Sequence, residues 1–196
     1  MLELTTLLQQ SIRLDRDITA RQQIHWRPQE RLQNAMVSLD VELAEMANTS
    51  EWFKVWKIHR GKADPDKTHR ETLLNEYVDA MDFFFLVSAI QQWTHLIPVT
   101  PEQLTTIAAK PATDLNKQYL AIKHLLYDAY FNHRQESYQH AWHVFLKIGL
   151  VDFGFTQDEI QTAFTAKNHV NEQRQANNYK KNNLIARFDH VTRLFF

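Results

Sequence analysis

Apolar residues recur every three or four positions along most of the 196-residue chain, which is the spacing of helices with one buried face. No alternating apolar and polar runs are joined by an Asn-Gly or Asp-Gly turn, the usual signal of a β-hairpin. Only three glycines and five prolines interrupt the helical pattern. The sequence therefore predicts an all-α fold, a helical bundle that forms a single domain over residues 1–196.

Turn residues and capping motifs set the expected helix boundaries. Thr68 with Glu71, and Thr156 with Glu159, have the spacing of capping boxes, and Pro101 suits the first position of a helix. We expect turns at 25–28 and 97–100, an aromatic segment at 52–57, and loops at 58–67 and 149–155. The predicted helices cover residues 3–23, 31–48, 68–95, 115–132, 137–148 and 156–176, with one more beginning at 101. The tail at 180–196 has no clear pattern.

The charge balance and the absence of cysteine exclude several functions. Lys and Arg number 22 and Asp and Glu 23, so no basic surface for nucleic acid or a membrane is expected. No apolar run approaches the roughly 20 residues that span a bilayer. Without cysteine there can be no disulfide, thiolate zinc site or cysteine nucleophile. The first residues also lack a signal-peptide pattern, and we expect a cytoplasmic protein.

Two carboxylate pairs lie where the surrounding residues are apolar. Glu42 and Glu45 are three residues apart on a predicted helix, so they share one face. Glu76 and Asp79 repeat this spacing in the most apolar helix, and Asp82 extends the stripe. Such pairs on facing helices would repel each other and take up protons or cations. A hard divalent cation with oxygen ligands resolves the conflict, and Mg²⁺ is the usual choice where phosphate is the other ligand.

Other interpretations of these acids stay open at this stage. Either pair alone is more typical of a solvated helix face, and Asp82 could be a ligand, a supporting residue or a surface acid. A di-iron carboxylate bundle would need Glu-x-x-His on two helices, and neither pair ends in histidine. His140 and His143 lie on a separate segment without a glutamate in register. We interpret them as surface or packing residues.

A polar segment late in the chain carries cations at helical spacing. Lys167, Asn171 and Arg174 are four and three residues apart and share one face. Lysine and arginine bind phosphate oxygens, arginine with two parallel hydrogen bonds. The alternative is an ordinary solvated helix end, where the helix dipole favours cations.

Taken together, these segments resemble the dimeric, all-α dUTP diphosphatases, relatives of the MazG-type nucleotide pyrophosphatases. Three blocks carry the resemblance: Glu42-Leu-Ala-Glu45 continuing to Phe53-Lys54-Val55-Trp56, then Glu76-Tyr-Val-Asp79, then 167–179. The last is similar to the family's Lys-x-x-x-Asn-x-x-Arg-Gln-x-x-Gly-Tyr signature. Two positions depart from the pattern: Asn178 replaces a glycine, and Asp82 stands where a histidine is often found.

The resemblance implies a fold of the all-α NTP pyrophosphatase type and a metal-dependent reaction. Glu42, Glu45, Glu76 and Asp79 would ligate two or more Mg²⁺ ions that bridge the triphosphate and activate a water. Attack at the α-phosphorus would release dUMP and pyrophosphate, and dUDP could also be a substrate. Glu45 is the candidate that also orients the water. The expected assembly is a homodimer.

Further substrate contacts follow from the same resemblance. The phosphates would be bound from the C-terminal side by Lys167, Asn171, Arg174 and Tyr179. Lys54 or Lys57 would also contribute to binding the phosphates. Trp56, with Phe53, would pack against uracil or the deoxyribose, although Trp56 could equally be core. Gln10 or its neighbour Gln9 would face the base.

Two competing functions remain open. A pyrophosphatase for another nucleotide, such as dCTP, would use the same carboxylates, and only a substrate panel would separate the two. A non-catalytic helical binding protein would carry the acidic pairs as surface features. It would show neither metal-dependent stabilisation nor hydrolysis.

Overall fold

Seven α-helices and no strand make up the part of the chain that the computed structural model describes, residues 2–176. The all-α prediction is therefore confirmed. Within these residues no helix has the length and apolar character needed to cross a membrane. In chain order the elements are α1 (Leu4–Arg21), α2 (Pro28–Ser50), α3 (His69–Ile90), the 3₁₀ turn η1 (Thr94–Leu96), α4 (Pro101–Ala108), α5 (Leu115–Asn132), α6 (Gln135–Lys147), the π-helical turn η2 (Ile148–Asp152) and α7 (Gln157–Ala176).

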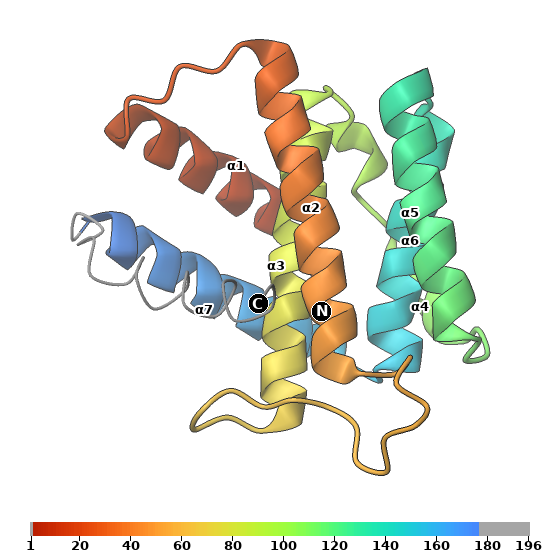
Figure 1. The fold of residues 1–196 in the computed structure, drawn as a ribbon. Helices are drawn as coiled ribbons and strands as arrows, with labels where there is room; N and C mark the ends of the chain where they lie inside the picture. The colour runs from red at the N-terminus through yellow and green to blue at the C-terminus, as the bar shows by residue number, and fades with distance from the viewer. Residues whose placement is uncertain (1, 177–196) are drawn as a thin grey trace, which may run out of the picture.

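Helix α3 lies at the centre of the bundle (Figure 1). Helix α2 runs antiparallel beside it along most of its length. The α5–α6 hairpin lies on one side of this pair, and α1 and α7 lie on the other side. As a result α3 has neighbours on several faces, and side chains on each face meet a different helix.

An aromatic core fixes α3 against α6. Tyr77 on α3 stacks on Phe145 of α6 with ring centroids 4.4 Å apart and planes 3° from parallel. Phe84 packs on Trp142 and also on Tyr138, whose hydroxyl donates to the Phe84 carbonyl. All five side chains are fully buried. This core holds α3 rigidly, so the polar residues on its other faces have well-defined positions.

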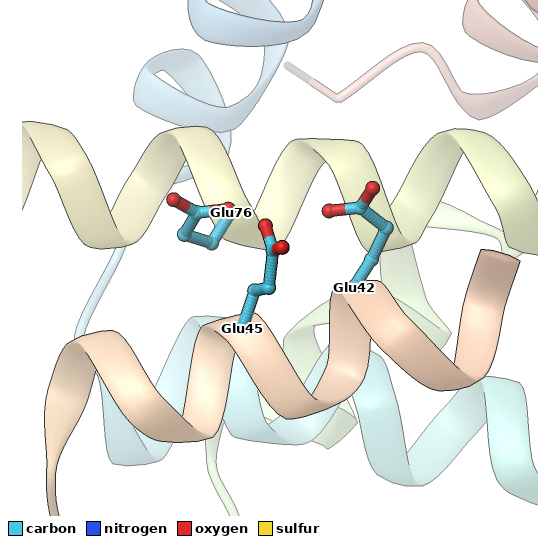
Figure 2. A group of neighbouring side chains, drawn as sticks. All are labelled: Glu42, Glu45 and Glu76. Atoms are coloured by element: carbon cyan, nitrogen blue, oxygen red, sulfur yellow. The ribbon is translucent and has the colours of Figure 1, made fainter. Parts of the chain in front are cut away.

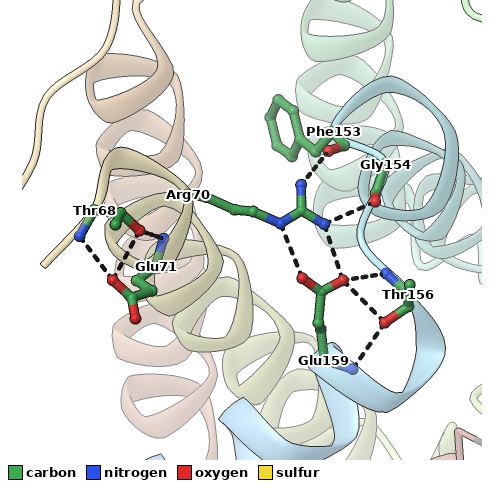
Figure 3. A network of polar contacts seen from close by, with 7 residues as sticks. All are labelled: Thr68, Arg70, Glu71, Phe153, Gly154, Thr156 and Glu159. Atoms are coloured by element: carbon green, nitrogen blue, oxygen red, sulfur yellow. Dashed lines mark hydrogen bonds and ion pairs between the residues drawn. The ribbon is translucent and has the colours of Figure 1, made fainter.

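Both expected capping boxes form, and one arginine ties the two helices that they begin (Figure 3). Thr68 accepts from the Glu71 N–H, and Glu71 accepts from the Thr68 N–H. Thr156 and Glu159 make the same exchange at the start of α7. Arg70 donates to both oxygens of Glu159 at 2.9 Å and to the carbonyls of residues 153 and 154. The starts of α3 and α7 are thus joined by Arg70 of α3 and the capping residue Glu159 of α7.

Two predicted boundaries were wrong by several residues. Helix α2 begins at Pro28, three residues before the predicted start, because proline at the first position costs no backbone hydrogen bond. Helix α3 ends at Ile90 rather than at 95. Gln92 adopts a left-handed backbone with φ of 61°, and the resulting turn packs Trp93 against Tyr138. Helix α5 has the predicted boundaries, Leu115–Asn132.

The predicted loop at 149–155 begins instead as a π-helical turn. Gly149 lies inside this turn, directly against the ring of Tyr77. A Cβ at position 149 would lie 2.3 Å from Tyr77 Cζ, so only glycine lets the ring pack there. This glycine therefore serves close packing within a helical turn, at a position where the sequence predicted a loop.

Candidate active site

The two carboxylate pairs face each other across the antiparallel α2–α3 pair. Glu42 lies opposite Asp79, and Glu45 lies opposite Glu76, because a three-residue step forward on α2 matches a three-residue step backward on α3. Figure 2 shows Glu42 and Glu45 projecting from α2 toward Glu76 on α3. One carboxylate oxygen from each of these three residues lies within 4.8 Å of the others. The helices thus bring together residues that lie more than 30 positions apart in the sequence.

Burial and mutual repulsion disfavour the charged forms of these acids. The pKa of Glu42 is raised from 4.5 to about 8, first by burial and then by the negative charges of Asp79, Glu45 and Glu76. The pKa of Glu76 rises to about 7, again through burial first and then through Glu45 and Asp79. The cluster takes up protons near neutral pH because its carboxylates repel one another, and a bound divalent cation would reduce the same repulsion.

The donor set fits a hard cation such as Mg²⁺. All three side chains offer oxygen atoms, and these atoms lie within 4.8 Å of one another. Two oxygens that share one Mg²⁺ lie at most about 4 Å apart, which is slightly closer. Among residues 2–176 this is the one group of three or more acidic or histidine side chains with such spacing. His140 is exposed and His143 is half-buried on α6, and neither belongs to such a group within that range.

Helix α7 brings its cations to the same place. Lys167 Nζ donates to Asp79 Oδ2, linking α7 to the carboxylate face of α3. Asn171 and Arg174 line the same cavity as Lys167, Glu42 and Asp79. This cavity has a volume of about 360 Å³, within the range of about 300–1,000 Å³ that is typical of small-molecule sites. Acidic residues of two helices and a basic face of a third therefore line one compartment.

Lys54 and Lys57 instead surround a glutamate that the sequence did not single out. Glu51 is completely buried at the end of α2, in a left-handed conformation with φ of 55°. Both lysines donate to its carboxylate at 2.8 Å, and the Gly61 N–H donates at 3.1 Å. The hydrogen bonds from Lys54 and then Lys57 hold the pKa of Glu51 at about 2. This carboxylate organises the segment between α2 and α3, which begins six residues after Glu45.

The residues predicted to contact the base, Trp56 and Gln10, differ in exposure. Trp56 is 71% exposed and meets Phe53 edge to face at 6.5 Å, so it is not core. Gln10 on α1 is half-buried, and within the described part of the chain its buried Oε1 has no hydrogen-bond partner. Tyr179 lies outside the described residues, as do Asn178 and the tail at 180–196.

Several cavity residues were missed by sequence reasoning. Ser11, Trp26 and Asn34 come from α1, the α1–α2 connection and α2, and no motif marks them. Phe83, Leu86 and Ile90 also line the cavity. They continue the helical stripe that begins at Asp79, and extending that stripe beyond the acids would have found them.

Comparison with known families bears on what this compartment does. The sequence model of the dUTPase family matches residues 3–179, which is most of the chain. The chain belongs to the dUTPase family. A search of curated proteins found no match. Membership gives the chain dUTP diphosphatase activity and a nucleotide substrate, and the helical architecture agrees with the all-α type. The wider relation to MazG-type pyrophosphatases stays a prediction.

Proposed function

We propose that the chain hydrolyses dUTP to dUMP and pyrophosphate in a Mg²⁺-dependent reaction at the α2–α3–α7 cavity. The observation that carries this proposal is the convergence of Glu42, Glu45 and Glu76 within 4.8 Å, with Glu42 also lining the cavity that contains Lys167 and Arg174 of α7. Repelling carboxylates next to phosphate-binding side chains need a cation, and a nucleoside triphosphate would supply the remaining oxygen ligands.

Glu42, Glu45 and Glu76 would hold the metal, with Asp79 as a fourth ligand and two or more ions per site. When bound, Mg²⁺ neutralises the triphosphate charge and lowers the pKa of a bound water. Asp79 also accepts a hydrogen bond from Lys167, so this lysine would fix the orientation of the carboxylate. The ligand set is thereby tied to the helix that carries the phosphate-binding residues.

The protein side chains would orient the nucleophile and the leaving group. Glu45, the most accessible of the three clustered acids, would accept a hydrogen bond from the attacking water and take its proton. The water oxygen would form a bond to the α-phosphorus, and the bond from this phosphorus to the bridging oxygen would break. Lys167 and Arg174 would stabilise the charge on the departing pyrophosphate, with Asn171 donating a hydrogen bond.

The other predicted contacts are part of the proposal. Tyr179 would complete the phosphate-binding face, and Gln10 and Trp56 would contact the base or sugar. Lys54 or Lys57 would reach the phosphates only by giving up a hydrogen bond to Glu51. Hydrolysis of dUDP would use the same residues, because it also breaks the bond that follows the α-phosphorus.

A matched pair of variants tests the metal site. Glu45→Gln removes one clustered carboxylate, whereas Glu136→Gln removes an exposed carboxylate on α6. We expect Glu45→Gln to lower the rate of pyrophosphate release by about 100-fold or more and to weaken Mg²⁺ binding measured by calorimetry. Glu136→Gln should change neither. Unchanged Mg²⁺ affinity and rate in a folded Glu45→Gln variant would overturn the assignment.

We further propose that the chain forms a homodimer through the outer faces of α2 and α5. Val37 and Val41 on α2, and Leu120 and Phe131 on α5, are between 46% and 72% exposed. Beside them lies a mainly apolar groove of about 430 Å³ between the two helices. Leu120→Glu should give a monomer by light scattering, whereas a wild-type monomer would contradict the proposal. A cytoplasmic location stays a prediction.

A further inference from the structure

The 360 Å³ cavity has two chemically different ends. Its charged end is lined by Glu42, Asp79, Lys167, Asn171 and Arg174. Its other end is lined by the apolar side chains of Ile18, Trp26, Phe83, Leu86 and Ile90, and the lining also includes Asn34 and the Asp15–Arg31 ion pair. A nucleotide has the same division, since its phosphates are charged and its base presents flat apolar faces. The charged end suits the phosphates, and the apolar end suits the base.

Two residues that line the cavity each have a buried polar atom without a hydrogen-bond partner among the described residues. Ser11 is 1% exposed and Asp82 Oδ1 is buried. Neither Ser11 Oγ nor Asp82 Oδ1 has a partner among the residues that the structure describes. Ser11 Oγ lies close enough to lower the pKa of the Asp82 carboxyl, but not in hydrogen-bond geometry. Buried polar groups of this kind are costly, so a partner from the ligand is the expected compensation.

The charges around Asp82 restrict what that partner can be. The pKa of Asp82 is raised from 3.8 to about 6, first by burial and also by the negative charges of Asp79 and Asp15, whereas Ser11 and Lys167 act to lower it. The carboxyl is therefore mainly ionised at neutral pH and can only accept hydrogen bonds. A phosphate oxygen at this position would be repelled. A neutral O–H or N–H donor of the nucleoside would be bound.

The position of Asp82 along α3 selects the donor. A helix rises about 1.5 Å per residue, so Asp82 lies about 4.5 Å along the axis from Asp79 at the charged end. Leu86 and Ile90 follow about 6 and 12 Å farther on, at the apolar end. In a nucleotide the 3′-hydroxyl lies between the phosphates and the base. Asp82 has the matching intermediate place.

We propose that Asp82 accepts a hydrogen bond from the 3′-hydroxyl of the deoxyribose, and that the nearby Ser11 Oγ orients the Asp82 carboxylate by donating to it when the nucleotide binds. Asp82 is then a substrate-binding residue that recognises the sugar, and Ser11 is a positioning residue. The inference rests on the proposed function, since it uses the same nucleotide orientation. It gives a role to the position at which this chain carries aspartate instead of histidine.

The test measures binding of product nucleotides, so it does not depend on turnover. Calorimetry compares dUMP with 2′,3′-dideoxyuridine monophosphate, which lacks the 3′-hydroxyl. We expect wild type to bind dUMP about tenfold or more tightly, as for a hydrogen bond to a charged group. In Asp82→Ala this preference should fall to nearly one. Asp82→Asn, which keeps one acceptor oxygen, and Ser11→Ala should retain part of it.

Three results would overturn the inference. One is an unchanged preference for dUMP in folded Asp82→Ala, and another is no preference in wild type, as when a resident water satisfies the carboxylate. The third is an Asp82→Ala variant that loses the preference for dUMP over N3-methyl-dUMP but keeps the preference over the dideoxy nucleotide, which would assign Asp82 to the base edge. These results can be distinguished from failure of the proposed function, because in that case wild type would not release pyrophosphate from dUTP with Mg²⁺.

Discussion

Replacement of Glu42 by glutamine should stabilise the metal-free protein at alkaline pH. The pKa of this carboxyl is raised from 4.5 to about 8, first by burial and then by the negative charges of Asp79, Glu45 and Glu76. Between these pH values the folded protein retains a proton that the unfolded chain has released. Stability therefore falls as the pH rises from about 4.5 to about 8, because the unfolded state binds fewer protons. Glutamine, which has no proton to lose, removes this part of the decline.

The expected size follows from the two pKa values. At about 1.4 kcal/mol per pH unit, a rise from 4.5 to 8 corresponds to at most about 5 kcal/mol. Solvent reaches part of the Glu42 side chain and screens its charge, so we expect about 2 kcal/mol. This amount is large compared with the total stability of a typical domain, about 5–15 kcal/mol.

Urea unfolding in EDTA at pH 5 and pH 8.5 measures the effect. Between pH 5 and pH 8.5 the free energy of unfolding of wild type should fall by about 2 kcal/mol more than that of Glu42→Gln. Glu136→Gln should behave as wild type. Added Mg²⁺ at 100 times its dissociation constant should restore about 2.7 kcal/mol to wild type at pH 8.5 and less to Glu42→Gln. Equal pH dependence in wild type and Glu42→Gln would refute the account of a strained, cation-requiring cluster.

Three further variants test the parts of the fold that support the site. Gly149→Ala should cost about 1–3 kcal/mol in urea unfolding, because the new Cβ would overlap the ring of Tyr77; an unchanged midpoint would mean that the ring adjusts. Glu51→Gln should speed tryptic cleavage in the 52–67 segment several-fold, since two lysines lose their buried anion. Equal digestion of the two proteins would argue against an organising role. Arg70→Met should lower stability by about 1 kcal/mol in thermal unfolding, with a smaller difference at high salt.

Helices and carboxylate pairs could be predicted because both depend on local spacing. Capping boxes at Thr68 and Thr156 involve residues three positions apart, and the structure confirms them. Glu42 with Glu45, and Glu76 with Asp79, were recognisable as pairs for the same reason. That the pairs face each other follows from the antiparallel packing of α2 and α3, which the sequence pattern suggests but does not determine.

Other site features depend on contacts between distant residues. Glu51 ends a helix in a left-handed conformation, so no periodic pattern indicated that it would be buried and bound by two lysines. Ser11 and Asp82 are 71 positions apart and line one cavity only because α1 packs against α3. Gly149 resembled a loop glycine, since its packing partner Tyr77 lies 72 positions earlier. Sequence spacing carries no information on such pairs.

The most direct test of the central claim is pyrophosphate release from dUTP, dTTP, dCTP and UTP, with Mg²⁺ or with EDTA. The account predicts rapid release from dUTP with Mg²⁺, slow release from the other three nucleotides, and none in EDTA. Mg²⁺-dependent turnover that favours dCTP would support the carboxylate metal site but contradict dUTP as the substrate. Equal release from dUTP with Mg²⁺ and with EDTA would contradict the assignment of Glu42, Glu45, Glu76 and Asp79 as a catalytic metal site.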